Sequence, residues 1–142
     1  MILLDTNVIS ALMRNTPDPA VVDWLDNLPA ESIWTTTVTV FEIRTGIELL
    51  VPSRRRERLD EMFSTLLDED LKGRVQAFDV AAAAAAGTIA AERQRAGRSV
   101  EIRDVQIAGI AASRRATLAT GNTRHFEHTG IGLVNPWGTE SR

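Results

Sequence analysis

The amino-acid sequence predicts an α/β fold in which a mainly parallel sheet of about four or five short strands is covered by helices on both faces. Short apolar or β-branched runs alternate along the chain with longer segments of helical spacing. The first run, Ile2–Leu4, is apolar at every position, which is typical of a strand buried on both faces. The 142 residues, of which 44% are hydrophobic, suffice for one cored domain over 1–142 but not for two.

In the first half of the chain, each predicted strand is followed by a segment that can form a helix. Asp5, Thr6 and Asn7 come directly after the first strand and are residue types that begin helices. Pro29 ends the second helix, because proline cannot continue a helix. The predicted segments are a helix at 8–13, a helix at 20–28, a strand at 32–36, a helix capped by Thr37 or Thr39 that runs to about residue 50, and a helix at 53–71.

The second half repeats the alternation. A third strand at 75–78 precedes an alanine-rich helix that Asp79 caps and Gly97 ends. We expect the small side chains at 81–86 to let this helix approach the sheet closely. The remaining predicted segments are a helix from Ser99 through Arg115, a strand at 117–120, a loop at 121–130 with room for one helical turn, and a candidate fifth strand at 132–135.

Composition excludes several classes of site. The chain has no cysteine and two histidines, so disulfides, thiol nucleophiles and cysteine-bound metals are excluded, and any metal must be held mostly by oxygen. The net charge of −3 argues against a surface that binds nucleic acid through a general positive potential, but local patches of the 15 arginines remain open. No apolar run is long enough for a signal peptide or a membrane span, so we expect a cytoplasmic protein without a membrane partner.

Three acidic residues stand in apolar surroundings. Asp5 ends the first strand, Glu42 lies between Phe41 and Ile43, and Asp104 interrupts the apolar positions of its helix. Each lies at or near a junction between a strand and a helix, where the carboxyl ends of parallel strands meet, so the three can converge on one edge of the sheet. Clustered carboxylates repel one another unless a cation neutralises them, and oxygen ligands favour Mg²⁺ or Mn²⁺.

Each of these residues also has a simpler explanation. Asp5 can cap the helix that follows it, and Asp104 can favour a first helical turn because of the helix dipole. Glu42 can reach solvent past Phe41. Spacing alone therefore favours a metal site only modestly.

Five segments in order resemble the PIN-domain ribonucleases, and more narrowly the VapC- and FitB-type toxins of bacterial toxin–antitoxin pairs. The segments are M-I-L-L-D-T-N-V-I-S at the start, T-V-F-E-I-R-T-G around Glu42, E-I-R-D-V-Q-I-A-G-I-A-A around Asp104, L-A-T-G-N-T-R-H-F at 118–126, and the closing V-N-P-W. The resemblance implies a PIN-like α/β/α sandwich and an endoribonuclease that depends on Mg²⁺ or Mn²⁺.

The resemblance also implies roles for single residues. Asp5, Glu42 and Asp104 match the acidic metal-binding positions, and Asn122 matches a fourth catalytic position where many relatives have Asp. The amide removes one negative charge, so it leaves open whether one or two ions bind. Thr6 and Asn7 match polar residues that support the ligands through hydrogen bonds, although both can simply form the helix cap.

Basic residues near the predicted site are candidates for RNA contact. Arg103 and Arg124 are the foremost, and Arg44 and the arginines at 54–58 are further candidates, although most exposed arginines are only solvated. His125 lies three residues after Asn122 and can be considered as a general acid or base, but a surface histidine is more often only solvated.

The resemblance implies three partners: an RNA substrate, a small cognate antitoxin whose tail can place an arginine among the carboxylates, and a second copy of the chain in a homodimer or larger toxin–antitoxin complex. Two other functions compete with this interpretation. A phosphoaspartyl phosphatase also has an Asp after its first strand, but Asn7 replaces the second Asp of its D-x-D pattern. A non-catalytic PIN-like module that binds RNA or protein would explain the altered position at Asn122.

Overall fold

The strands of the computed structural model, which describes residues 1–138, form a parallel sheet in the order β3-β2-β1-β4-β5. β1 (Ile2–Leu4) lies in the middle between β2 (Ile33–Thr36) and β4 (Thr117–Ala119), and the outer strands are β3 (Val75–Gln76) and β5 (Gly132–Val134). The chain runs outward from β1 through β2 to β3 and then returns to β4 on the other side of β1. A topological switch point therefore lies between β1 and β4, the place where parallel sheets commonly bind ligands.

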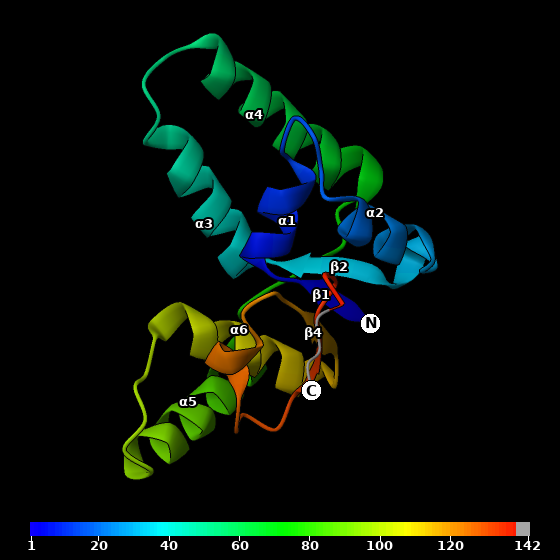
Figure 1. Ribbon diagram of the computed structural model, residues 1–142. Coiled ribbons are helices and arrows are strands. Elements are labelled where there is room, and N and C mark those ends of the chain that lie inside the picture. Colours follow the sequence, from blue (N-terminus) through cyan, green and yellow to red (C-terminus); the bar gives the residue numbers. More distant parts are fainter. Residues whose placement is uncertain (139–142) are drawn as a thin grey trace.

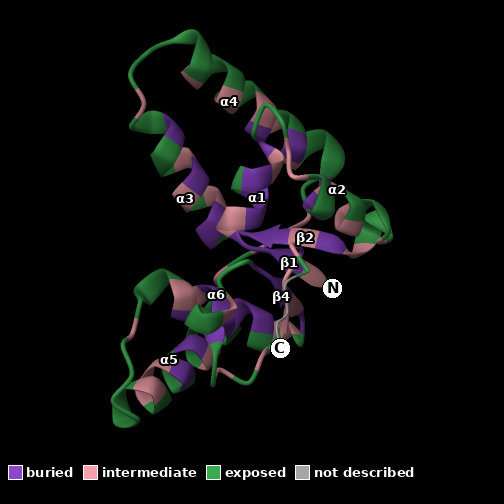
Figure 2. Ribbon diagram, in the orientation of Figure 1, coloured by how far each residue is buried: buried purple, intermediate pink, exposed green. Residues whose placement is uncertain are grey.

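Two layers of helices cover the sheet (Figure 1). Each central strand contributes alternate side chains to the two layers, as a strand period of two requires: Leu4 and Ala119 belong to one buried cluster, and Leu3 and Leu118 to the other. Figure 2 shows this burial along the central strands. The first layer comprises α1 (Thr6–Leu12), α2 (Pro19–Asp26), α3 (Thr37–Glu48) and α4 (Arg54–Thr65), and the second comprises α5 (Val80–Arg95) and α6 (Ile102–Arg114). The predicted α/β fold with helices on both faces is confirmed.

Short helical turns lie between the main elements, and some observed boundaries differ from the predicted ones. The helix predicted at 53–71 is α4 followed by a π-helical turn, η2 (Leu66–Asp70). One 3₁₀ turn, η1 (Ala30–Ser32), precedes β2, and another, η3 (Thr123–Phe126), is the helical turn expected in the loop after β4. The third strand is shorter than predicted, with only Val75–Gln76 paired to β2.

Two helices begin at residues other than those predicted. α3 is capped by Thr36, whose Oγ1 accepts a hydrogen bond from Thr39 N at 3.1 Å, so the prediction of Thr37 or Thr39 as the cap is wrong. α6 is capped by Glu101, because its carboxylate accepts from the backbone of Arg103, and the predicted start at Ser99 is three residues early. In both cases a side chain that satisfies the free N–H groups of the first turn decides where the helix begins.

The alanine-rich helix packs differently from the expectation. Asp79 caps α5, and Gly97 follows its end with a φ of 73°, as predicted. The close approach, however, is between α5 and α6: a Cβ built on Gly109 would lie 2.5 Å from Ala82 O and 2.6 Å from Ala86 Cβ. The small side chains therefore allow two helices of one layer to pack closely.

Over residues 1–138, none of the helices combines the length and the apolar character needed to cross a bilayer.

Candidate active site

Asp5 and Thr120 lie side by side where β1 and β4 end. The register pairs Leu4 with Ala119, and Asp5 N donates to Ala119 O at 3.0 Å, so the next residue of each strand emerges at the carboxyl edge of the sheet. Asp5 is only 6% exposed. A carboxylate is thereby held at the topological switch point that the strand order creates.

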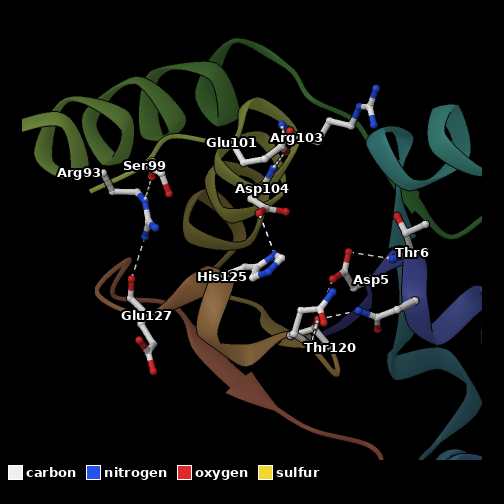
Figure 3. Close-up of polar contacts among 12 residues, drawn as sticks. Asp5, Thr6, Arg93, Ser99, Glu101, Arg103, Asp104, Thr120, His125 and Glu127 are labelled. Carbon is white, nitrogen blue, oxygen red and sulfur yellow. Dashed lines mark hydrogen bonds and ion pairs between the residues drawn. The ribbon is translucent and has the colours of Figure 1, made fainter. Parts of the chain in front are cut away.

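Both carboxylate oxygens of Asp5 accept hydrogen bonds. Oδ1 accepts from Thr6 N at 2.8 Å, as expected for the cap of α1, and Oδ2 accepts from Thr120 Oγ1 at 2.7 Å (Figure 3). Burial raises the pKa of Asp5, the hydrogen bonds from Thr120 and Thr6 oppose the shift, and the neighbouring charge of Glu42 adds to it. Capping and a role in the site are therefore compatible for Asp5.

Thr120 is a residue of the site that the sequence analysis missed. Its hydroxyl is fully buried and also accepts from Asn7 Nδ2 at 3.3 Å and from Asn122 N at 3.0 Å. Asn7 in turn accepts from Gly121 N at 3.1 Å, which ties α1 to the turn after β4. The sequence does contain a signal, because Thr120 ends an apolar strand as Asp5 does, but its meaning depends on the pairing of β1 with β4.

Glu42 lies in the first half of α3 and reaches the same edge. Thr6 Oγ1 donates to Glu42 Oε1 at 2.5 Å and lies 3.2 Å from Thr39 Oγ1, so Thr6 links the start of α1 to α3. The other carboxylate oxygen, Oε2, lies 3.4 Å from Arg103 Nη1. The Arg103 guanidinium also lies over the ring of the exposed Phe41, with 5.6 Å between Cζ and the ring centroid.

Asp104 belongs to the first turn of α6 and contacts the loop after β4. Its Oδ2 lies 3.2 Å from His125 Nδ1 (Figure 3). Burial raises the pKa of Asp104, the nearby His125 opposes the shift, and the negative charges of Glu101, Asp5 and Glu42 increase it. Asp104 therefore lies within electrostatic range of both other carboxylates.

The predicted site residues thus lie at one edge of the sheet, but they differ in how closely they contact one another. Asp5, Glu42 and Asp104 influence one another electrostatically, but within residues 1–138 no three Asp, Glu or His side chains are placed close enough to hold one ion together. Glu42 is engaged by Thr6 and Arg103, and Asp104 by His125. Asn122 is exposed and joins the site through its backbone N–H.

The chemistry of these donors suits a hard divalent cation. All three side chains offer carboxylate oxygen, which Mg²⁺ and Mn²⁺ prefer. Burial is the largest cause of the raised pKa of Asp5 and of Asp104, because it penalises the charged carboxylate. Asn122 can supply an amide oxygen but no charge.

Two hollows open from this edge. The larger, of about 490 Å³, runs from Thr6 and Glu42 between α1, α3 and α4 and has an apolar floor with arginines at its rim. The smaller, of about 230 Å³, lies beside Asp104 and His125 and is also lined by Arg124. Arg103 and Arg124, the two arginines predicted to contact RNA, therefore lie near the site in different settings: Arg103 is paired with Glu42, and Arg124 faces the smaller hollow.

Comparison with known proteins identifies one family. The PIN domain model matches residues 2–131. The plasmid stability protein StbB of Pseudomonas syringae pv. tomato is 39% identical over 96% of this chain and 99% of its own length. The toxin FitB of Neisseria gonorrhoeae is 35% identical over 96% of this chain and 99% of its own length. The VapC ribonuclease Y4jK of Sinorhizobium fredii is 34% identical over 96% of this chain and 98% of its own length.

Comparison with solved structures identifies relatives of the same kind. A chain in the structure of FitAB bound to the IR36 DNA fragment superimposes with a TM-score of 0.89 at 34% identity, covering 100% of this chain and 99% of that one.

Proposed function

This chain belongs to the PIN-domain family, and we propose that it is an endoribonuclease, the toxin of a toxin–antitoxin pair, that hydrolyses RNA phosphodiester bonds. The observation that carries the proposal is the gathering of Asp5, Glu42 and Asp104 at the switch point of the sheet. Relatives over nearly the whole chain are named as a toxin and as a ribonuclease, which supports the same activity here.

Asp5, Glu42 and Asp104 would supply oxygens to a Mg²⁺ or Mn²⁺ ion. As placed in the structure, the three are not close enough to ligate it together, so Glu42 and Asp104 would have to exchange their contacts with Arg103 and His125 for the ion or reach it through water. Such an ion, when bound, lowers the pKa of a water molecule for attack on a phosphodiester and offsets negative charge in the transition state. The chain's own part is to orient the oxygens: Thr6 N and Thr120 Oγ1 fix Asp5, and Thr6 Oγ1 fixes Glu42. His125 Nδ1 contacts Asp104 Oδ2, and Asn122, whose backbone N–H donates to Thr120, would offer a neutral amide.

We propose a small antitoxin as the protein partner, and the larger hollow as its binding groove. The groove has the apolar floor that a peptide segment needs, formed by side chains of α1, α3 and α4, and it leads to Glu42. An arginine delivered along it would satisfy the carboxylates without activating water. The structures of toxin–antitoxin complexes among the chain's structural relatives support this partner, and we expect a homodimer or a larger toxin–antitoxin complex.

Two observations favour a second candidate, a non-catalytic PIN-like module that binds RNA or protein. Asn122 lowers the negative charge of the site, and Arg103 already pairs with Glu42. Both features would weaken the attraction for a divalent ion.

Metal-dependent cleavage separates the two candidates. The purified chain is incubated with labelled RNA in Mg²⁺, in Mn²⁺ and in EDTA, after removal of any antitoxin. The nuclease cuts RNA in either ion and stops in EDTA, whereas a binding module leaves the RNA intact under all three conditions.

A further inference from the structure

A pocket separate from the larger groove opens on the Asp104 side of the site. It has a volume of about 230 Å³ and lies between the end of α5, the start of α6 and η3. Arg93 and Arg124 line it, together with Glu101, Asp104 and His125. Its wall therefore carries two arginines beside two carboxylates.

Arg93 is held by hydrogen bonds to two backbone carbonyl groups. Its Nε donates to Ser99 O at 3.1 Å and its Nη1 to Glu127 O at 2.9 Å, which clamps the loop before α6 to the loop after η3 (Figure 3). Within residues 1–138 it forms no ion pair. Two carbonyl groups satisfy part of its hydrogen bonding but leave its full positive charge.

Arg124 is the second such charge. Its side chain is exposed and makes no hydrogen bond or ion pair with any residue that the structure describes. The two carboxylates of the pocket already have partners, since Glu101 accepts from the first N–H groups of α6 and Asp104 contacts His125, which also lines the pocket. Arg124 is thus the guanidinium of this pocket that is open to an incoming anion, with the charge of Arg93 beside it.

We infer that this pocket binds a backbone phosphate of single-stranded RNA next to the phosphodiester that is cut. The inference rests on the proposed ribonuclease function, because it assigns the path of that substrate. A guanidinium fork matches the geometry of a phosphate group, and the pocket begins at Asp104, so a nucleotide neighbouring the cut lies within its reach.

The same geometry gives Arg103 a different role. Arg103 pairs with Glu42 and lies over Phe41, so its charge is partly compensated and its position fixed by α3. Arg124 has no such constraint. Of the two arginines predicted to contact RNA, Arg124 is therefore the one available to a phosphate.

The salt dependence of RNA binding tests this assignment. Fluorescence anisotropy of a short labelled RNA is measured in EDTA, which suppresses cleavage, for the wild type, Arg124→Gln, Arg124→Lys and Arg115→Gln. Arg115 is also an exposed arginine, lies at the end of α6 and away from Asp104 in the first turn of that helix, and serves as the control. Between about 50 and about 200 mM salt, loss of one phosphate contact lowers the slope of log K against log salt by about 0.7.

We expect Arg124→Gln to show the slope reduced by one phosphate contact and to bind RNA several-fold more weakly. Arg124→Lys should keep the wild-type slope, and Arg115→Gln should match the wild type in both slope and affinity. An unchanged slope in Arg124→Gln, or an equal loss in Arg115→Gln, would overturn the pocket assignment while leaving the nuclease intact. A wild type that neither binds nor cuts RNA would instead contradict the proposed function, and the cleavage assay in Mg²⁺ or Mn²⁺ distinguishes the two failures. Melting temperatures verify that all four proteins are folded.

Discussion

The hydroxyl of Thr120 donates a 2.7 Å hydrogen bond to Asp5 Oδ2, across 115 positions of the chain. The bond exists because β1 and β4 are paired neighbours in the sheet, although β2 and β3 come between them in the sequence. It fixes one oxygen of the most buried carboxylate of the site and connects Asp5 to Asn7 and to the backbone of Asn122.

Replacing Thr120 with valine should therefore disturb both stability and activity. Valine has nearly the same shape but leaves the buried Asp5 Oδ2 without its donor and Asn122 N without its acceptor. We expect a loss of about 1 to 3 kcal/mol in the free energy of unfolding, measured by urea denaturation, together with a lower rate of RNA cleavage. Thr120→Ser keeps the hydroxyl and should restore most of both; a valine variant as stable and active as the wild type would rule out the positioning role.

The carboxylate of Asp104 should destabilise the metal-free fold at neutral pH. Its pKa is raised in the folded chain, chiefly by burial, so folding favours the protonated form. The stability that protonated Asp104 contributes is fully present below the pKa of this group in the unfolded chain. It is lost as pH rises through the raised pKa of the folded chain. Asp104→Asn should therefore melt at a higher temperature than the wild type at pH 7 in EDTA, with the difference closing below about pH 4.

Asp79 is a control for Asp104, because its pKa is shifted in the opposite direction. The pKa of Asp79 is lowered by the hydrogen bond from Ala82 N and by Arg114, so its contribution is present above the unfolded pKa and disappears as pH falls through the lowered value. Asp79→Asn retains a capping side chain and should be less stable than the wild type at pH 7, with the gap closing in acid. Melting curves for both variants across pH that shift in the same direction would contradict this assignment of charges.

Gly109 should be intolerant of any side chain because α5 crosses it closely. A methyl group there would meet Ala82 O at 2.5 Å and Ala86 N at 2.8 Å, which are backbone atoms that cannot move aside. We expect Gly109→Ala to cost about 1 to 3 kcal/mol of stability in chemical denaturation. Gly87→Ala, at an exposed position of α5 with no atom within 4 Å of the new Cβ, should instead stabilise by about 0.5 to 1 kcal/mol; equal effects at both positions would contradict the close packing of α5 on α6.

The sequence predicted the strands, the helical layers and the edge where Asp5, Glu42 and Asp104 lie, because apolar runs and their polar ends are local signals. It did not predict the role of Thr120, since a threonine that ends a strand gains meaning only from the neighbouring strand. It also placed the start of α6 at Ser99, whereas the helix begins at Ile102, because the Glu101 carboxylate accepts from the backbone N–H groups of Arg103 and Asp104.

The alanine-rich segment shows the same limit. Its small side chains correctly indicated a close approach, but the partner is Gly109 of α6, more than twenty positions away. The sequence pattern alone indicates that the side chains on one face of a helix are small. Only the tertiary fold determines which element packs on that face.

The most direct measurement is RNA cleavage in Mg²⁺ or Mn²⁺ by purified wild type and Asp5→Asn, with circular dichroism to establish that both are folded. The asparagine retains an oxygen for Thr6 N but removes the buried negative charge at the switch point. We predict that the wild type cuts RNA and that the variant loses about a hundredfold or more of that activity. Undiminished cleavage by folded Asp5→Asn would contradict a carboxylate-held metal as the source of the activity.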